Sequence, residues 1–225
     1  MNNASEESIA GQAVYSKKLL SVYDLWVLGI SNSLIWKCRT KNILRWLNQS
    51  LTANHLDVGV GTGYYLEHCT FPDSPVRLGL LDLNPNSLEA TANRASRYVP
   101  EVYQADVLQP LPDQPRRFDS VSLNYLLHCL PGDLSSKAVL FDHLAPWLNP
   151  GAIISGSTIL HEGVPKGLTA RRLMDFYNRK QIFSNSADQL DELQSQLSRR
   201  YTEVELKVIG CVTLFRAQHN PSKTN

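Results

Sequence analysis

The chain has 225 residues, 43% of them hydrophobic, and a formal net charge of +1. This length and composition suit one globular domain with a full core, and a charge so close to neutral argues against a global attraction to nucleic acid or to an anionic membrane. The four cysteines are far apart and form no C-x-x-C pair, so neither a zinc site nor a disulfide framework is indicated.

The N-terminal region predicts a helical leader. Residues 1–10 are polar, and no run in the chain approaches the ~18 apolar residues that span a bilayer, so we expect a cytoplasmic protein without membrane attachment. Between Leu19 and Ile30, apolar side chains recur at spacings of three and four, which predicts an amphipathic helix. A second helix is expected over residues 33–47, so that residues 1–50 form the leader.

From residue 54 onward, strand and helix patterns alternate, which predicts a parallel sheet with helices on both faces. Asn84-Pro85 and Asp133 mark helix starts, because they combine a capping side chain with a compatible first turn. Strands are expected over residues 54–58, 77–83, 101–105, 118–124 and 152–157, and helices over residues 64–69, 84–98 and 134–148.

The alternation changes after the fifth strand. Two helices are expected over residues 165–180 and 186–200, followed by strands over 201–208 and 211–217. Only Ile209 and Gly210 separate these strands, too few residues for a helical crossover, so they should be antiparallel neighbours. We therefore expect a main domain over residues 51–218 and a flexible tail over 219–225.

A glycine-rich loop follows the first strand. Asp57 ends an apolar run, and Gly59, Gly61 and Gly63 follow at alternate positions. Glycine permits positive φ and close approach of a ligand, whereas a carboxylate at this point would repel the pyrophosphate of a dinucleotide. A nucleoside with a cationic amino-acid tail, such as S-adenosylmethionine (SAM), fits better. The alternative is an ordinary strand-to-helix turn with a capping aspartate.

A second acid ends the second strand. Asp82 lies 19 residues after Gly63, where α/β nucleotide folds place a carboxylate that grips the ribose hydroxyls. The following Leu83 could cover one face of an adenine. The alternative role for Asp82 is capping of the next helix, but Asn84 already serves that purpose.

These motifs resemble those of class I SAM-dependent methyltransferases over roughly residues 54–156, most closely the small-molecule enzymes of secondary metabolism. The resemblance implies a Rossmann-like, doubly wound, mostly parallel seven-stranded sheet with one antiparallel strand near its edge. It also implies that Asp106 and the Val107 amide bind the adenine and that Asn124 lies beside the cofactor. A surface turn is the alternative role for Asp106.

The resemblance extends to the leader and to two histidines. In comparable enzymes the leader lids the site, so Tyr15 and Tyr23 are candidate contacts to the cofactor carboxylate, with core packing as the alternative. His128, four residues after the fourth strand, is the first candidate general base, because histidine titrates near neutral pH. His161 is the second, and a structural histidine bonded to backbone is the alternative. No metal is expected.

The expected reaction is methyl transfer from SAM to a small organic acceptor, most often an oxygen of a secondary metabolite, by a monomer or homodimer. One alternative is an enzyme of the same fold that uses bound SAM for a cyclisation or rearrangement without methylation. Two further alternatives are a non-catalytic cofactor sensor and, more distantly, a dinucleotide oxidoreductase.

Overall fold

The computed structural model describes residues 31–114 and 116–223. Within them lies one seven-stranded sheet in the order β3-β2-β1-β4-β5-β7-β6, parallel except for β7, which is antiparallel to both β5 and β6. The strands are β1 (Asn54–Val58), β2 (Arg77–Asp82), β3 (Glu101–Gln104), β4 (Phe118–Asn124), β5 (Leu148–Ile159), β6 (Tyr201–Ile209) and β7 (Val212–His219). This confirms the predicted fold class and the antiparallel pairing at the C-terminal end.

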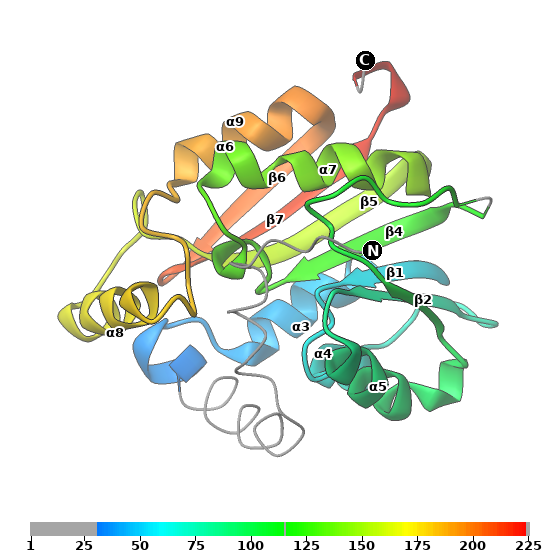
Figure 1. The fold of residues 1–225 in the computed structure, drawn as a ribbon, viewed down its shortest axis with the longest axis horizontal. Helices are drawn as coiled ribbons and strands as arrows, with labels where there is room; N and C mark the ends of the chain where they lie inside the picture. The colour runs from blue at the N-terminus through cyan, green and yellow to red at the C-terminus, as the bar shows by residue number, and fades with distance from the viewer. Residues whose placement is uncertain (1–30, 115, 224–225) are drawn as a thin grey trace.

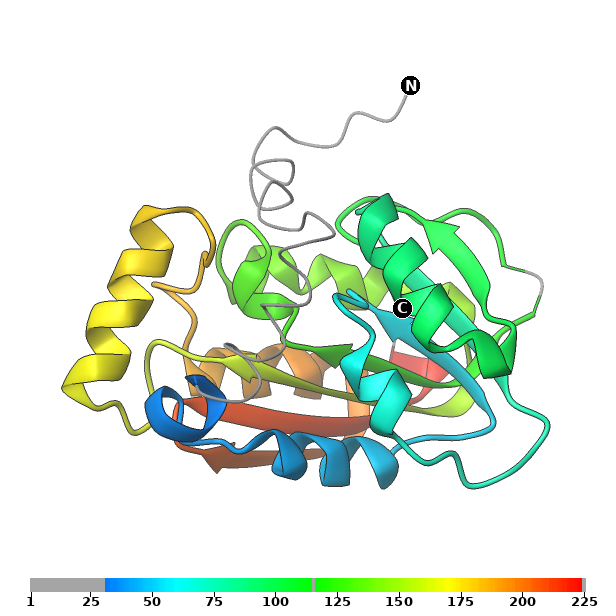
Figure 2. The ribbon, with the colours of Figure 1, turned by 90° about the horizontal axis from the view of Figure 1, so that it is seen from below.

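Helices cover both faces of the sheet (Figure 1). Figure 1 shows α6, α7 and α9 along one side and α3, α4 and α5 along the other, and Figure 2 shows α8 at the end of the molecule away from α5. The helices are α3 (Thr40–Asn48), α4 (Tyr64–His68), α5 (Pro85–Arg94), α6 (Leu134–Lys137), α7 (Val139–Leu144), α8 (Leu168–Arg179) and α9 (Leu190–Arg200), with short 3-10 turns η2 (Ser96–Tyr98), η3 (Leu127–Cys129), η4 (Ala145–Trp147) and η5 (Pro221–Lys223).

The core is built from the central strands and the helices on each face. Leu56 on β1 and Val121 on β4 are fully buried and belong to the largest hydrophobic cluster, which continues into α6, α7 and α9. A second cluster joins α3, α8 and the β5–β7 pair, and a third joins α4 and α5 to β2. The near-continuous apolar runs of β1, β2 and β4 therefore reflect burial on both faces.

The predicted helix over residues 33–47 is wrong in its first half. Residues 31–35 form a π-helical turn, the chain is then non-helical to Arg39, and α3 begins only at Thr40. Lys37 has a left-handed φ of 56°, and the Trp36 carbonyl accepts a hydrogen bond from the Cys211 N–H at 2.9 Å. Contact with the turn between β6 and β7 thus overrides the local helical pattern. The first predicted leader helix lies outside the described residues.

The predicted helix over residues 134–148 is interrupted. Asp133 caps α6 as expected, but the segment breaks into α6, α7 and η4, and β5 begins at Leu148, four residues before its predicted start. Pro146 lies in η4, and proline lacks the N–H that an α-helix needs. The predicted tail also starts too early, because His219 is the last residue of β7 and is 4% exposed.

The helices of the described residues are too short or too polar to cross a membrane.

Candidate cofactor site

The predicted polar residues gather at one edge of the sheet, because the parallel strands β1 to β4 all end there. Asp57 is the penultimate residue of β1, Asp82 ends β2 and Asn124 ends β4. Asp106 follows β3, whose last residue Gln104 pairs with Asp82 in the sheet register. The topology therefore brings together four side chains that are spread over 68 positions of the sequence. This is the edge where open α/β sheets bind their ligands.

The glycine loop between β1 and α4 has the predicted unusual backbone. Gly59, Gly61 and Gly63 have φ values of 70°, 55° and 77°. A Cβ on Gly63 would lie 3.0 Å from the Thr91 Cα of α5, so this glycine allows close packing of the loop on that helix. At Gly61, no described atom lies within 4 Å of the position that a Cβ would take. The space beside Gly61 that a side chain would fill is therefore open to a ligand.

Asp57 is a buried acid without a positively charged partner among the described residues. It is 6% exposed, its Oδ1 accepts a hydrogen bond from the Ser122 hydroxyl, and the described residues form no ion pair with it. Burial raises its pKa to about 7, an effect that the Ser122 hydrogen bond opposes and the negative charge of Asp82 reinforces. A positively charged ligand group at this position would stabilise the carboxylate.

Asp82 is half-buried, and its Oδ1 accepts a hydrogen bond from the Asn84 N–H at 2.8 Å. Burial raises the pKa of Asp82 to about 6, although backbone amides on both sides of the carboxylate, among them Gly61, favour its charged form. Asn84 caps α5 by accepting from the Asn86 N–H at 2.9 Å. Because Asn84 fills that role, Asp82 is not needed as the helix cap, as expected from the sequence.

The third acid is engaged in a turn. The Asp106 Oδ1 accepts a hydrogen bond from the Leu108 N–H at 3.0 Å, as in the surface-turn alternative, and the residue is half-buried next to Val107, which is buried. The Val107 carbonyl lies 3.0 Å from His143 Nδ1. Leu83 lies just beyond the end of β2, and its carbonyl accepts from the Gln104 side chain at 3.3 Å. These contacts leave the adenine-binding roles as predictions.

Asn124 and Tyr125 form a strained strand end. The Asn124 Oδ1 accepts from the Ser157 hydroxyl at 3.1 Å, whereas its buried Nδ2 has no hydrogen-bond partner among the described residues. Tyr125 has a φ of 57°, an unusual value for a bulky residue, and its hydroxyl donates to the Asn32 Oδ1 at 2.8 Å. Such strain concentrates at functional sites. The sequence analysis did not identify Tyr125 and Asn32 as site candidates, because no local sequence pattern predicts a left-handed backbone at a tyrosine.

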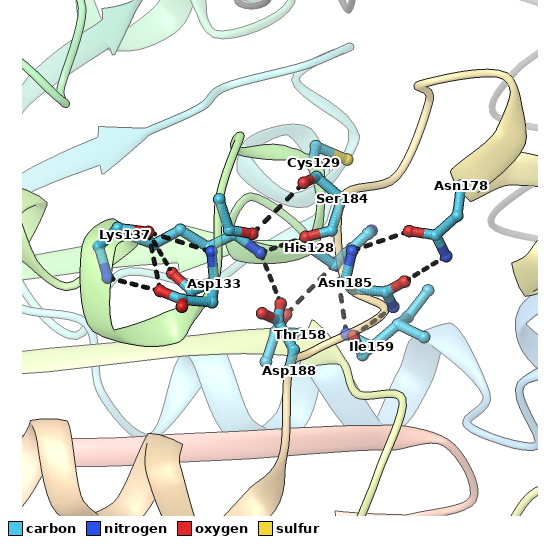
Figure 3. Close-up of polar contacts among 12 residues, drawn as sticks. His128, Cys129, Asp133, Lys137, Thr158, Ile159, Asn178, Ser184, Asn185 and Asp188 are labelled. Carbon is cyan, nitrogen blue, oxygen red and sulfur yellow. Dashed lines mark hydrogen bonds and ion pairs between the residues drawn. The ribbon is translucent and has the colours of Figure 1, made fainter.

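His128 is more deeply buried than a general base requires. It is 3% exposed, and its Nδ1 accepts a hydrogen bond from the Ile159 backbone N–H at 3.3 Å (Figure 3). Burial, with a smaller contribution from the charge of Lys137, lowers its pKa to about 3, so the ring is neutral and its proton lies on Nε2. These contacts favour the alternative role, a structural histidine bonded to backbone.

His161 has a different environment just past β5. Its side chain is 19% exposed, and its Nδ1 lies 2.9 Å from the Glu162 Oε1, to which Lys166 also donates at 3.1 Å. The Glu162 carboxylate only accepts and therefore favours a proton on Nδ1, and its contact is shorter than that of the Lys166 ammonium, which lies 3.4 Å from the same nitrogen and only donates. With the proton on Nδ1, Nε2 presents a lone pair. The nearest acid to Nε2 is Asp175 of α8, 3.9 Å away. The candidate contacts Tyr15 and Tyr23 lie outside the described residues.

A buried ion pair fixes the segment between α8 and α9 to α6 (Figure 3). Lys137 of α6 lies 2.7 Å from the Asp188 Oδ2, both side chains are fully buried, and the same ammonium donates to the Ser184 carbonyl at 2.5 Å. The Ser184 N–H donates to the His128 carbonyl at 2.8 Å. This arrangement links the loop after β4 to the chain leaving α8, although its members are far apart in sequence.

The site fits the ligand that the sequence resemblance implies. A buried carboxylate without a cation (Asp57) suits an ammonium group, and a carboxylate at the end of the neighbouring strand (Asp82) suits vicinal hydroxyls. The open space beside Gly61 leaves room for a ligand at the loop that follows β1.

Comparisons with known proteins agree. A methyltransferase-domain family model matches residues 56–154. The chain is 40% identical to a demethylluteothin O-methyltransferase of Streptomyces thioluteus over 94% of this chain and 92% of that protein. It is 38% identical to the physcion biosynthesis cluster O-methyltransferase of Aspergillus chevalieri, over 92% and 94% of the two chains.

Among solved structures, the fold is similar to that of the N-methyltransferase NodS from Bradyrhizobium japonicum WM9 in complex with S-adenosylhomocysteine. That comparison has a TM-score of 0.62 at 18% identity and covers 94% of this chain and 98% of NodS. The sheet order, the acids at the strand ends and the close full-length relatives together show that this chain belongs to the S-adenosylmethionine-dependent methyltransferases.

Proposed function

We propose that this enzyme transfers the methyl group of SAM to an oxygen atom of a small secondary metabolite. The observation that carries the proposal is the pair of O-methyltransferase relatives, which match more than nine-tenths of this chain and whose names refer to luteothin and to the physcion cluster. The formal net charge of +1 agrees with a small acceptor, since it gives no strong overall attraction for a nucleic acid.

In this proposal the sheet edge holds the cofactor along its length. Asp57 binds the ammonium group, Asp82 binds the ribose hydroxyls, and Asp106 with the Val107 amide binds the adenine, one face of which Leu83 covers. The loop backbone at Gly59, Gly61 and Gly63 lies along the amino-acid tail, with Asn124, Tyr15 and Tyr23 as further contacts. When bound, the cofactor supplies an electrophilic methyl group on a sulfonium. The residues contribute chiefly by alignment, which can supply up to roughly 7–11 kcal/mol.

The acceptor would lie over the carboxyl ends of β4 and β5, against α8. On α8, Met174 is fully buried in the core, whereas Phe176 is 43% exposed and Leu168 is 76% exposed. The apolar side chains of α8 thus contribute partly to the core. The exposed Phe176 and Leu168 offer aromatic and aliphatic surface for a hydrophobic acceptor.

We propose His161 rather than His128 as the base that takes the proton of an acceptor hydroxyl. Its Nε2 makes no hydrogen bond to the described residues and presents a lone pair in the tautomer that Glu162 favours, whereas the His128 Nδ1 is occupied by the Ile159 N–H. His161→Ala is expected to lower kcat about 100-fold, because general-base catalysis contributes at least that factor, and to leave the affinity for S-adenosylhomocysteine unchanged. Steady-state kinetics and calorimetry on the same preparations measure both quantities.

The companion variant is His128→Ala. It is expected to lower stability by about 1–3 kcal/mol, because the Ile159 N–H loses its acceptor, while the pH dependence of kcat keeps the wild-type midpoint. A loss of kcat in His128→Ala that is largest above the midpoint of the wild-type pH profile, where the base is unprotonated, with His161→Ala fully active, would reverse the assignment.

Methyl-labelled SAM, incubated with the protein and a metabolite extract, tests the function itself. Mass spectrometry should find the label on a new product together with S-adenosylhomocysteine in equal amount. A converted product without label, formed while SAM is not consumed, would instead support the non-methylating cyclisation or rearrangement. Label attached to nitrogen or carbon would contradict the proposed oxygen acceptor.

A further inference from the structure

A chain of hydrogen-bonded, buried polar side chains runs along the neighbouring strands β1 and β4 and ends at Asp57. The imidazole of His55 on β1 is fully buried, with Nδ1 2.8 Å from the Ser120 hydroxyl and Nε2 3.0 Å from the Ser122 hydroxyl. Ser122 in turn donates to the Asp57 Oδ1. At the far end, the Thr52 backbone N–H donates to the Ser120 hydroxyl at 3.0 Å.

The hydrogen bonds in this series all run in one direction, from Thr52 toward Asp57. Ser122 uses its one hydroxyl proton on Asp57, so it must accept from Nε2–H of His55. The neutral imidazole then has only Nδ1 as acceptor, which takes the hydroxyl proton of Ser120. Burial keeps the imidazole neutral, since it lowers the pKa of His55 to about 3. The amide of Thr52 therefore starts a series of donors that ends on the carboxylate.

A histidine in a sheet core is costly unless both ring nitrogens are bonded. Here both bonds are made across the β1–β4 pair, where His55 faces Ser120 and Asp57 faces Ser122 in register. The arrangement does more than satisfy His55, because successive hydrogen bonds polarise one another and strengthen the last donor. That last donor acts on the acid to which the cofactor ammonium is assigned.

We propose that Ser122 and His55 are positioning residues that hold the Asp57 carboxylate charged and oriented for the ammonium group of the cofactor. This inference rests on the proposed role of Asp57. Ser122 acts by direct donation, and His55 acts through Ser122 by fixing the direction in which that hydroxyl points.

The proposal predicts a characteristic pH dependence. Besides Ser122, the groups that act on Asp57 from the described elements are Asp82 of β2 and Cys69, which follows α4. With the pKa of Asp57 near 7, the carboxylate is charged above that pH and binds a cation, whereas below it a proton competes with the ligand. Between pH 8 and pH 6 the dissociation constant of a cationic ligand should rise about tenfold.

Removing the donor should shift this dependence upward. Without Ser122 the pKa of Asp57 rises, because its hydrogen bond favours the charged form. Calorimetric titration with S-adenosylhomocysteine between pH 5.5 and 8 should show a higher midpoint for Ser122→Ala and about tenfold weaker binding at pH 7. His55→Leu should shift the midpoint less, in the same direction. The double variant should bind no worse than Ser122→Ala, since both changes interrupt one chain.

A second ligand separates this role from a general structural one. Methylthioadenosine keeps the ribose and adenine but lacks the ammonium group, so its pH dependence reports Asp82 without Asp57. Ser122→Ala should leave its affinity unchanged, as should Ser155→Ala for both ligands. Ser155 is a buried serine on β5, paired in register with Ser122, and it is not a member of the chain.

The outcomes are distinguishable. If wild-type protein binds neither ligand, the proposed function itself fails. If Asp57→Asn loses affinity for S-adenosylhomocysteine while Ser122→Ala and His55→Leu keep the wild-type profile, the role of Asp57 stands and the positioning role is wrong. Equal weakening of both ligands by Ser122→Ala would also overturn the positioning role, since it indicates damage to the whole site.

Discussion

Asp82→Ala is expected to weaken the binding of S-adenosylhomocysteine by about 10²- to 10⁴-fold. In the proposed complex the Asp82 carboxylate accepts from two ribose hydroxyls, and each hydrogen bond to a charged group contributes about 1.5–3 kcal/mol. The backbone amides of Gly61 and Asn84 already favour the charged carboxylate, so the acceptor is preorganised before the ligand arrives. Isothermal titration calorimetry at about pH 8 measures the change directly.

Asp73→Ala is the matched control, because Asp73 is an exposed acid in the loop before β2, remote from the strand ends. Its dissociation constant should equal that of the wild type. If Asp82→Ala also kept the wild-type affinity while remaining folded, the assignment of the ribose to this carboxylate would be wrong.

The second large effect concerns stability. Asp188→Ala is expected to lower the free energy of unfolding by about 3–5 kcal/mol, because it leaves the Lys137 ammonium buried without its counter-charge. Both side chains are fully buried, and the pair ties α6 to the segment that leaves α8 (Figure 3). Urea denaturation followed by circular dichroism gives the difference in unfolding free energy.

Glu205→Ala provides the comparison for an exposed pair. Glu205 lies 2.6 Å from Arg216, but its side chain is half exposed, so its loss should cost less than about 1 kcal/mol. Equal losses of unfolding free energy in the two variants would show that burial does not increase the contribution of the Lys137–Asp188 pair to stability.

The strand pattern was largely readable from the sequence. β1 and β4 have the predicted bounds, because each is a short apolar run with turn signals on both sides. The glycine loop after β1 was predictable from the alternate spacing of its three glycines. The helix errors have a common cause. Over residues 33–47 and 134–148, apolar periodicity continues through positions where Lys37 turns left-handed or Pro146 interrupts the helix.

The position of a candidate residue was predictable where it depends only on the residue's own strand, as for Asp57 near the end of β1 and Asp82 at the end of β2. Its contacts were not predictable where the partner comes from another strand or helix. His55 and Ser122 are 67 positions apart, and Lys137 and Asp188 are 51 apart, so their contacts depend on sheet register and helix packing. For the same reason the burial of His128 and its hydrogen bond from the Ile159 backbone N–H could not be predicted from its place after β4.

A crystal structure with S-adenosylhomocysteine bound is the most direct test of the account. It should place the amino group of the ligand within hydrogen-bonding distance of Asp57, the ribose hydroxyls on Asp82 and the adenine beside Asp106. Ligand density at another edge of the sheet, with no ligand atom near these three carboxylates, would contradict the central claim.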